Sequence, residues 1–289
     1  MEDIYVLTKE NYPQQLLEIP QVPVELYARG PLPDPAVYTY LAVVGSRKYT
    51  SYGRDAVEKL IAGLAGYPVV IVSGLALGID TLAHTNALKN NLLTIGIPGS
   101  GIDPDAMHPK ANVQLARNIV DAGGCIMCEL KPHEKATQYS FPQRNRIMAG
   151  MCRAVLVVEA EEKSGTLITA RLATEYNRDV LVVPGSIFSP NSKGTNFLLR
   201  SGATPITCAE DLLNALGFTK IEDTEHAQQK LLLDCSADEL RILDILREPT
   251  NRDDLARALD MPIGELNMLL SLMEIKGYIK EEYGDIKRV

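Results

Sequence analysis

The sequence predicts an α/β protein: a doubly wound, mostly parallel sheet followed by a small winged-helix domain. Short apolar segments rich in β-branched residues recur from Leu41 onward, as expected of strands covered on both faces. Helical patterns separate these segments, and this alternation implies parallel strands with right-handed crossovers, as in a Rossmann-like domain. In the C-terminal quarter, three helical segments precede a hairpin pattern. The chain is therefore expected to hold one large and one small domain.

The expected sheet domain covers residues 41–217. Its expected strands are 41–44, 69–72, 92–97, 125–129, 154–158 and 180–183. The expected helices between them are 51–65, 78–90, 110–122, 142–151 and 166–178. Residues 1–40 contain six prolines. They are expected to form a lead-in, with a short helix and an edge strand, packed on the sheet.

The expected winged-helix domain covers residues 237–289 and follows a polar linker over 218–236. Its first helix opens with a capping-box pattern, Ser236 with Glu239. The segments 251–259 and 264–276 are the second and third expected helices, and a hairpin turning at 284–285 completes the pattern. Three helices and a hairpin are typical of a winged helix-turn-helix.

The acidity of the chain is concentrated in its C-terminal quarter. The whole sequence carries 29 basic and 37 acidic residues, a net charge of −8, of which residues 221–289 contribute −7. A helix that reads a DNA major groove is expected to be basic, whereas the third helix offers Glu265, Glu274 and a single Lys276. This favours a protein-docking or regulatory module. A regulator that reads an operator through this domain is the alternative.

The composition excludes several classes of protein. With 46% hydrophobic and 23% charged residues, the chain is an ordinary globular protein. It has no apolar run of membrane-spanning length and no apolar signal core, so a cytoplasmic location without membrane contact is expected. Cys125 and Cys128 have CxxC spacing, but no second pair completes a zinc site. On a strand they would point to opposite faces, so no metal site is expected.

Glycine-marked loops follow several of the expected strands. In a parallel sheet such loops meet at the carboxyl edge, where ligands bind. Glycines let backbone N–H groups approach an anion, and the helix N-termini behind them favour negative charge. Arg47 adds a permanent cation after the first strand. The loops predict a phosphate site and have the sequences Gly45-Ser46-Arg47, Ser73-Gly74, Pro98-Gly99-Ser100-Gly101, Ser164-Gly165-Thr166 and Pro184-Gly185-Ser186.

The segment 141–150, FPQRNRIMAG, is the most informative of the chain. Arg144 and Arg146 can neutralise phosphates with forked donors. Phe141 offers a face on which a base could stack. Asn145 could hydrogen-bond a base edge or merely tie the loop. The alternative interpretation of the segment is a surface turn with a helix cap.

Known nucleotide-enzyme motifs are absent from the sequence. It has no GxGxxG after the first strand and no GxxxxGK[ST], which disfavours a nicotinamide dehydrogenase and a P-loop hydrolase. Asp80 and His84, four residues apart on an expected helix, could form a metal pair or a catalytic dyad. A helix-capping aspartate beside a hydrogen-bonded histidine is the favoured interpretation. No catalytic residue and no cofactor are therefore expected.

Taken together, these motifs resemble the DprA (Smf) family of bacterial DNA-processing proteins. The resemblance covers about residues 5–216, and the acidic C-terminal domain is similar to a module that many members carry. The matching pieces are VVGSR (43–47), SGLALGID (73–80) with Ala83-His84, HPKAN (108–112), FPQRNRIMAG (141–150), Glu159-Ala160, SGTLITA (164–170), VPGS (183–186), GTN (194–196) and Gly202-Ala203.

The resemblance implies a recombination mediator rather than an enzyme. Such a protein binds single-stranded DNA, forms a homodimer through its Rossmann-like domain, and helps load RecA during natural transformation of competent cells. The implied phosphate contacts are Arg47 and Lys110. The implied pocket residues are Phe141, Arg144, Asn145 and Arg146, with Gly45, Ser46, Ser73, Gly74, Gly165 and Thr166 as a backbone cradle.

The sequence departs from this family's pattern in two places. His108 stands where members usually carry tyrosine, and the helical SAM-like domain with which many members begin is expected to be absent. An alternative function is that of the phosphoribohydrolases that activate cytokinins, which have a similar core and a PGGxGTxxE loop. Here Thr169 stands at the position of their catalytic glutamate, and a threonine is not a carboxylate base.

Overall fold

The computed structural model describes residues 3–218 and, in the C-terminal part, 236–246, 250–259, 261–276, 279–282 and 285–288. The chain divides into two compact units, Met1–Thr219 and Lys220–Val289. The boundary falls within the linker expected over 218–236, of which only Phe218 and Ser236 lie among the described residues.

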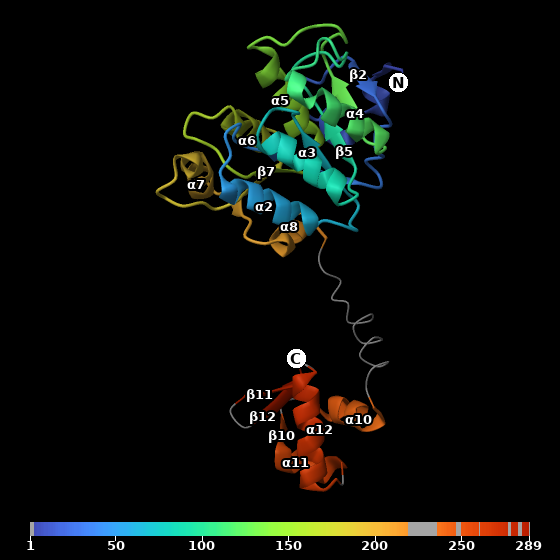
Figure 1. The fold of residues 1–289 in the computed structure, drawn as a ribbon, viewed down its shortest axis with the longest axis vertical. Helices are drawn as coiled ribbons and strands as arrows, with labels where there is room; N and C mark the ends of the chain where they lie inside the picture. The colour runs from blue at the N-terminus through green and yellow to red at the C-terminus, as the bar shows by residue number, and fades with distance from the viewer. Residues whose placement is uncertain are drawn as a thin grey trace. The chain divides into compact units, whose positions relative to one another are not determined.

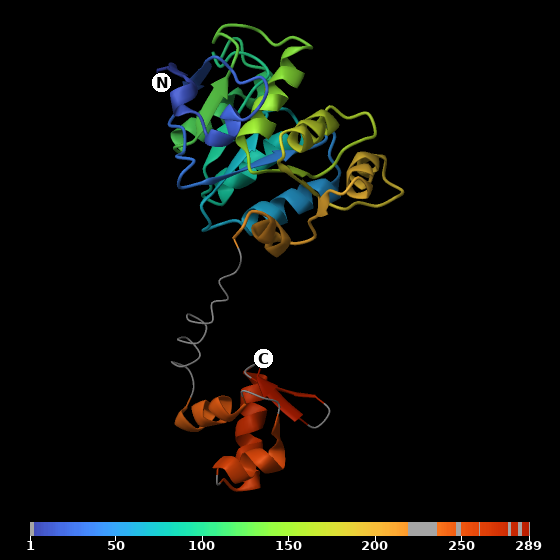
Figure 2. The same ribbon diagram turned by 180° about the vertical axis from the view of Figure 1, so that it is seen from behind.

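The first unit is a nine-stranded sheet with helices on both faces (Figures 1 and 2). The strand order is β1-β2-β6-β5-β4-β3-β7-β8-β9. Strands β3 to β9 pair in parallel, and β1 and β2 form an antiparallel edge next to β6. This mostly parallel, Rossmann-like sheet confirms the predicted fold class. The strands are β1 (Tyr5–Leu7), β2 (Leu26–Arg29), β3 (Thr39–Val44), β4 (Val69–Ser73), β5 (Thr94–Gly96), β6 (Cys125–Cys128), β7 (Ala154–Val157), β8 (Asp179–Val182) and β9 (Thr204–Pro205).

All six strands and all five helices expected between residues 41 and 183 are present, with boundaries shifted by a few residues. The lead-in supplies β1 and β2 as well as a short helix. The helices of this unit are α1 (Gln14–Leu17), α2 (Ser51–Ala62), α3 (Ile79–Lys89), α4 (Val113–Asp121), α5 (Ser140–Met151), α6 (Thr166–Glu175), α7 (Lys193–Arg200) and α8 (Ala209–Ala215), with single 3-10 turns at Lys9–Asn11, Lys110–Asn112 and Pro190–Ser192.

The alternation of side chains along the strands builds a core on each face of the sheet. In β3, Ala42 and Val44 belong to the core beneath α1, α5 and α6, and Leu41 and Val43 belong to the core beneath α2, α3 and α8. Figure 1 looks onto the second of these faces. Cys125 and Cys128 of β6 fall into different clusters, which confirms that they point to opposite faces.

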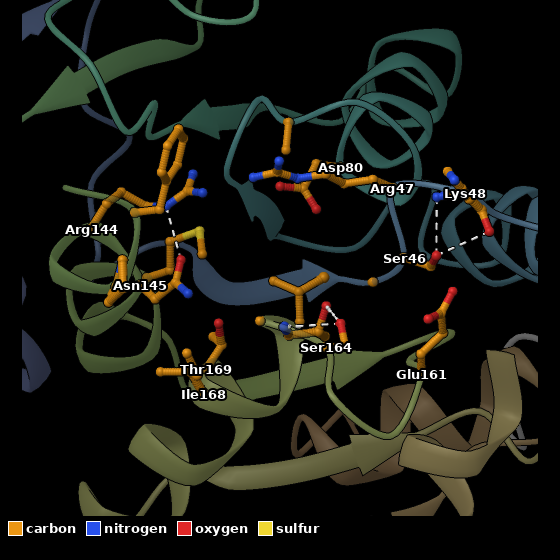
Figure 3. A pocket seen from close by; sticks show the side chains of 18 residues that line it. Ser46, Arg47, Lys48, Asp80, Arg144, Asn145, Glu161, Ser164, Ile168 and Thr169 are labelled. Carbon is orange, nitrogen blue, oxygen red and sulfur yellow. Dashed lines mark hydrogen bonds between the residues drawn. The ribbon is translucent and has the colours of Figure 1, made fainter. Parts of the chain in front are cut away.

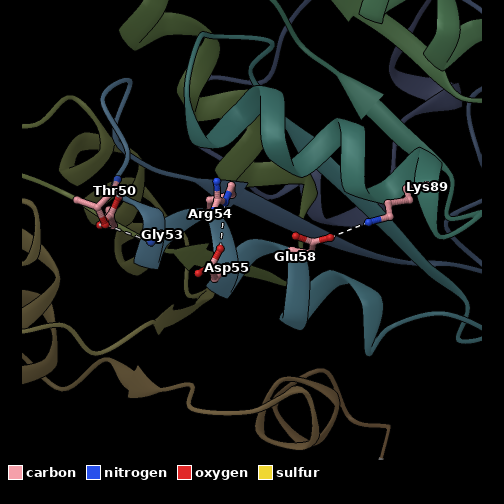
Figure 4. Close-up of polar contacts among 7 residues, drawn as sticks. Thr50, Gly53, Arg54, Asp55, Glu58 and Lys89 are labelled. Carbon is pink, nitrogen blue, oxygen red and sulfur yellow. Dashed lines mark hydrogen bonds and ion pairs between the residues drawn. The ribbon is translucent and has the colours of Figure 1, made fainter.

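The start of α2 is fixed by a threonine cap (Figure 4) and by a buried carboxylate. Thr50 caps the helix by accepting a hydrogen bond from Gly53 N (3.3 Å). Glu159, beyond the end of β7 and 2% exposed, accepts hydrogen bonds from Thr50 N (2.9 Å) and Thr50 Oγ1 (2.6 Å). The loop between β3 and α2 is thereby tied to the neighbouring strand.

The order of the strands changes direction at β3. From β3 the chain adds β4, β5 and β6 on one side, then returns to add β7, β8 and β9 on the other. The connections after β3 and β7 therefore leave in opposite directions and open a crevice beyond the carboxyl ends of these strands. Such a topological switch point is the usual ligand site of an open α/β sheet.

The second unit is a winged helix, as the sequence predicted. Ser236 Oγ accepts from Glu239 N (3.2 Å) and Glu239 Oε2 accepts from Ser236 N (2.7 Å), which confirms the capping box. The domain has its own core, which includes Ile242, Leu255 and Leu266. Of the expected turn at 284–285, Gly284 lies outside the described residues. The elements are α10 (Ala237–Ile245), β10 (Thr250–Asn251), α11 (Arg252–Leu259), α12 (Ile263–Ile275), β11 (Ile279–Glu282) and β12 (Asp285–Arg288), with the sheet order β10-β12-β11.

The described residues bear on two expectations from the sequence, those concerning membrane contact and a metal site. None of the helices in this part of the chain is both long enough and apolar enough to cross a membrane. The same residues contain no group of three or more His, Cys, Asp or Glu side chains placed to hold a metal ion.

Candidate nucleic-acid interface

A pocket of about 430 Å³ opens at the switch point, beyond the carboxyl ends of β3 and β7 (Figure 3). Its volume lies within the range of roughly 300–1,000 Å³ that is usual for small-molecule sites. Three cations line it, Arg47, Lys48 and Arg144, together with two carboxylates, Asp80 and Glu161. Arg47 and Asp80 lie on one wall, across the opening from the start of α6.

The loop that carries Arg47 rests directly on the start of α3. Ile79 N donates to Ser46 O (3.1 Å), and Ser46 Oγ accepts from Lys48 N (3.0 Å). Gly78 has φ +91°, and a Cβ at this position would lie 2.3 Å from Ser46 O and 2.6 Å from Arg47 Cα. Glycine is therefore required at residue 78, both for its backbone conformation and for this close approach.

Arg47 lies over an aromatic ring at the mouth of the pocket. Its Cζ is 5.4 Å from the centroid of the half-buried Phe141 ring, within the distance of a cation–π contact. The ring of His108 lies 6.1 Å from that of Phe141 at an interplanar angle of 67°. His108 thus still makes an aromatic contact, although it stands where tyrosine was expected.

Arg144 is buried behind this stack, with 8% of its surface exposed. Its Nε donates to Asn145 Oδ1 (3.0 Å) and its Nη1 donates to Ile97 O. The guanidinium lies against Gly74, where a Cβ would fall 2.0 Å from Nη1. Burial lowers the pKa of Arg144 to about 10, an effect that the nearby carboxylate of Asp80 opposes. Arg144 therefore stays charged at neutral pH, and its hydrogen-bond partners are neutral groups.

Asp80 and His84 have separate partners in the structure. Asp80 accepts a hydrogen bond from Gly74 N (3.1 Å), and His84 Nδ1 lies 2.7 Å from Thr94 Oγ1. Burial raises the pKa of Asp80, whereas Arg144 lowers it. Burial also lowers the pKa of His84, to about 3. These contacts favour structural roles for both residues over a catalytic dyad.

The start of α6 forms the opposite wall. Ser164, Gly165 and Thr166 line the pocket, and Ser164 Oγ accepts from Thr166 N (3.2 Å). A helix N-terminus carries partial positive charge, which adds to the attraction of an anion. Thr169, one turn further on and 1% exposed, also lines the pocket.

A smaller cavity of about 40 Å³ continues the pocket past Phe141. Arg47, Ala76 and Phe141 line both cavities. The smaller one is completed by Gly74, Leu77 and the His108–Pro109 pair. The two cavities adjoin at the ring of Phe141, and together they are called the switch-point groove below.

The structure brings together most of the residues that the sequence assigned to this site. Gly74 lines the smaller cavity, next to the ring of Phe141. The segment 141–150 belongs to helix α5, so its interpretation as a surface turn is wrong. The main pocket is lined by Gly45, Ser46, Arg47, Phe141, Arg144, Asn145, Gly165 and Thr166.

Three predicted residues do not line either cavity. Arg146 Nη2 instead bonds both carboxylate oxygens of Glu129 (2.5 and 2.6 Å). Lys110 Nζ donates to Pro104 O (3.0 Å) and Asp105 O (2.8 Å) in its own loop. Ser73 is fully buried, and its hydroxyl donates to Val43 O (2.7 Å). The prediction that Arg146 shares a pocket with Arg144 is wrong, because the two side chains leave opposite sides of α5.

Two charged residues of the site were missed by the sequence interpretation. Lys48 follows Arg47 directly, and Glu161 lies four residues beyond the end of β7. Both come from loops at the carboxyl ends of β3 and β7. Their positions in the sequence, just after two strands of the parallel sheet, could have identified them, since any charged side chain at this edge is a candidate for the switch-point crevice.

The fold and the pocket define a class: a Rossmann-like α/β protein with a cationic, aromatic-lined crevice at its switch point, joined to a winged helix. The chain belongs to the DprA family. The model of the family "DNA recombination-mediator protein A" matches residues 3–217, and that of the "DprA winged helix domain" matches residues 224–285.

Several known proteins are similar to this chain. It is 44% identical to the DNA processing protein DprA of Streptococcus pneumoniae over 214 residues, 74% of each chain. It is 34% identical to the protein Smf of Escherichia coli over 287 residues, 97% of this chain and 75% of that one.

Solved structures show the same similarity. The X-ray structure of the S. pneumoniae DprA has a TM-score of 0.68 at 41% identity, over 73% of this chain and 74% of that chain. A structure of the Helicobacter pylori DNA processing protein A has a TM-score of 0.66 at 31% identity, over 75% of this chain and 98% of that chain. The H. pylori structure was reported for its single-stranded DNA binding mode.

Proposed function

We propose that this protein binds single-stranded DNA in the switch-point groove, without cleaving it, and thereby acts as a recombination mediator. The observation that carries the proposal is the Arg47 guanidinium, 5.4 Å from the ring centroid of Phe141, with the buried Arg144 behind it. Cations beside an aromatic platform are the combination that single-strand-binding proteins use.

Each part of the groove has a role in this proposal. Arg47 and Lys48 neutralise phosphates at the rim, and the buried Arg144 contributes positive charge from behind Phe141. A base stacks on Phe141, which requires an unpaired strand because the ring is half-buried in the groove. Asn145 Oδ1 accepts from Arg144, so the amide nitrogen of Asn145 remains a donor toward a base carbonyl. Stacking and phosphate contacts tolerate any sequence.

The substitution Arg47→Glu tests this assignment. We expect it to weaken binding of a labelled oligo-dT by at least about tenfold, because a phosphate attraction becomes a repulsion. We also expect the dependence of log K on log salt to fall by about one charge. Arg54→Glu is the matched control, since Arg54 is an exposed arginine that pairs with Asp55 (3.0 Å) and lines neither cavity (Figure 4). Equal affinities of the two variants in fluorescence anisotropy would rule out the pocket as the DNA site.

The proposal extends to the oligomeric state of the protein and to the loading of RecA onto single-stranded DNA. Membership of a recombination-mediator family supports loading of RecA onto incoming single strands during natural transformation. Three exposed apolar side chains support a homodimer through the Rossmann-like unit: Ile187 (79%), Phe188 (89%) and Phe197 (54%). Sedimentation of the full chain tests the dimer. The rate at which RecA starts ATP hydrolysis on single strands tests the loading, and Arg47→Glu is expected to abolish any acceleration.

Nucleotide hydrolysis is a second candidate, favoured by the two carboxylates that line the pocket. Asp80 is tied to the backbone of Gly74 (3.1 Å), which leaves the exposed Glu161 as the carboxylate able to act as a base. Release of free base from nucleoside monophosphates, lost in Glu161→Gln, would establish this activity. With Thr169 where the phosphoribohydrolases have their catalytic glutamate, we expect no release.

A further inference from the structure

A second cavity, of about 330 Å³, lies between α4, the loop over 103–107 and the strands β2 and β6. Figure 1 shows α4 beside β2 and β5. The cavity shares no lining residue with the groove described above. Its volume is at the lower end of the range of about 300–1,000 Å³ for small-molecule sites.

The walls of this cavity are mostly apolar. Of the nine lining residues, six are apolar and come from three different parts of the chain. Concave apolar surfaces of this size favour a ligand with an apolar body, because the ligand and the walls both leave water. The apolar lining residues are Pro104, Met107, Val113, Ala116, Val120 and Ile126.

The remaining three lining residues are charged. They are Arg29, Arg117 and Asp121, so the cations exceed the carboxylates by one. Arg29 comes from β2, and Arg117 is an exposed residue of α4. The two cations attract an anionic group, and the carboxylate of Asp121 disfavours a second negative charge on the ligand.

The guanidinium of Arg29 has N–H donors without a hydrogen-bond acceptor. Its side chain is 17% exposed, Nη1 donates to Ile102 O (3.3 Å), and Nη2 lies 3.7 Å from the carboxylate of Asp103. Its Nε is buried and has no hydrogen-bond partner among the described residues. An arginine has five N–H donors, and leaving them unpaired at the edge of a cavity is unfavourable. An anionic ligand would accept hydrogen bonds from the Nη1 and Nη2 donors that these two contacts leave unused, since the buried Nε is out of its reach.

We propose that this cavity binds a small amphipathic monoanion. The apolar body of the ligand occupies the space between α4 and β6, and its carboxylate or sulfonate group faces Arg29 and Arg117. The site is independent of the single-strand groove.

The test uses the full chain and the probe 8-anilinonaphthalene-1-sulfonate, whose fluorescence rises in apolar surroundings. We expect saturable binding of one probe per chain. Arg117→Glu is expected to weaken it roughly tenfold or more, and Ala116→Phe to abolish it by filling the cavity. Because Ala116 is buried (4% exposed), circular dichroism must show that the Ala116→Phe variant is folded. Arg117→Glu changes only an exposed side chain and carries the test if Ala116→Phe fails to fold.

Two controls separate this site from others. Arg54→Glu makes the same charge change outside every cavity named here, and Arg47→Glu changes the single-strand groove. Both are expected to bind the probe like the unmodified protein. Loss of probe binding in Arg47→Glu would place the probe in the DNA groove and overturn the proposal, and so would equal titrations of Arg117→Glu and Arg54→Glu.

The anionic group of the ligand is tested by competition. Decanoate and decanol share an apolar chain of ten carbons and differ in charge at neutral pH. We expect decanoate to displace the probe at lower concentration than decanol. Equal displacement by the two compounds would overturn the assignment of Arg29 and Arg117 as anion contacts.

Discussion

The buried Arg144 of the sheet unit and the buried Glu239 of the winged helix have different kinds of partner. In the sheet unit, Arg144 is 8% exposed and donates to two neutral groups, an amide oxygen and a backbone carbonyl. In the winged helix, the buried Glu239 is paired with Lys276 at 2.7 Å. A cation with neutral partners keeps its charge available for an incoming anion, whereas an ion pair largely cancels it. The difference supports the proposal that single-stranded DNA binds to the sheet unit.

The cations at the rim of the pocket also differ from the arginines of the winged helix. Arg47 and Lys48 stand at the rim of the switch-point pocket. In the winged helix, Arg252 bonds Glu281 (2.5 Å) and Arg257 lies 3.1 Å from Asp254. Residues 221–289 carry a net charge of −7 and residues 1–220 a net charge of −1. This acidity opposes contact with a phosphate backbone. The proposed difference between the two units leads to three predictions.

The largest effect is expected from Phe141→Ala. Removing a stacking platform costs about 1–3 kcal/mol per base, so the affinity for single-stranded DNA should fall roughly 5- to 150-fold in fluorescence anisotropy. Tyr139→Ala is the control, because Tyr139 is an aromatic residue two positions away, 71% exposed, that lines neither cavity of the groove. Equal losses in the two variants would mean that the groove does not bind the bases.

A smaller effect, on the stability of the sheet unit, is expected from the buried His84 when the pH is lowered. His84 has a pKa of about 3 in the fold, against an ordinary 6.5, so the unfolded chain takes up its proton first as the pH falls. Stability is therefore lost from about pH 6.5 downward, by about 1 kcal/mol between pH 7 and pH 5.5. The thermal midpoint of the sheet unit should drop by about 2–4 °C over this interval.

The control for this prediction is His133, an exposed histidine of the same unit. His84→Gln should flatten the pH dependence between pH 7 and pH 5.5, and His133→Gln should leave it unchanged. A midpoint that falls equally in both variants would show that other groups cause the loss.

The smallest effect is expected from removal of the winged helix. A chain ending at residue 219 retains both cores of the sheet and the whole groove. Its affinity for single-stranded DNA should stay within about twofold of that of the full chain, because residues 221–289 offer no net positive charge. The isolated fragment 236–289 should bind neither single- nor double-stranded DNA. Tight binding of a duplex by this fragment would instead support the operator-reading alternative.

Much of the fold could be predicted because the signals are local. The apolar runs of β3 and β7 and the helical patterns between strands set the layers of the sheet. The capping box at Ser236 and Glu239 set the start of the winged helix. Glycine-marked loops at strand ends placed the site at the carboxyl edge, since every parallel strand of a sheet ends at the same edge.

The pairing of individual charges could not be predicted in the same way. Lys110 is held by two carbonyls of its own loop, and Arg146 by Glu129, a residue 17 positions earlier in the sequence. Both contacts depend on how loops and helices pack, which no local pattern specifies. The partner of Arg144, a carbonyl at residue 97, is more remote still, 47 positions earlier in the sequence.

The sequence by itself determined the order of the strands and helices, the division into two units and the edge of the sheet at which the pocket opens. The tertiary structure decided which side chains line that pocket. On α5, Phe141, Arg144 and Asn145 are spaced three and four residues apart and share one side of the helix. Arg146 lies two residues beyond Arg144, about 200° around the axis, and turns to Glu129 on the other side. Arg144 therefore lines the groove, whereas Arg146 forms an ion pair within the fold.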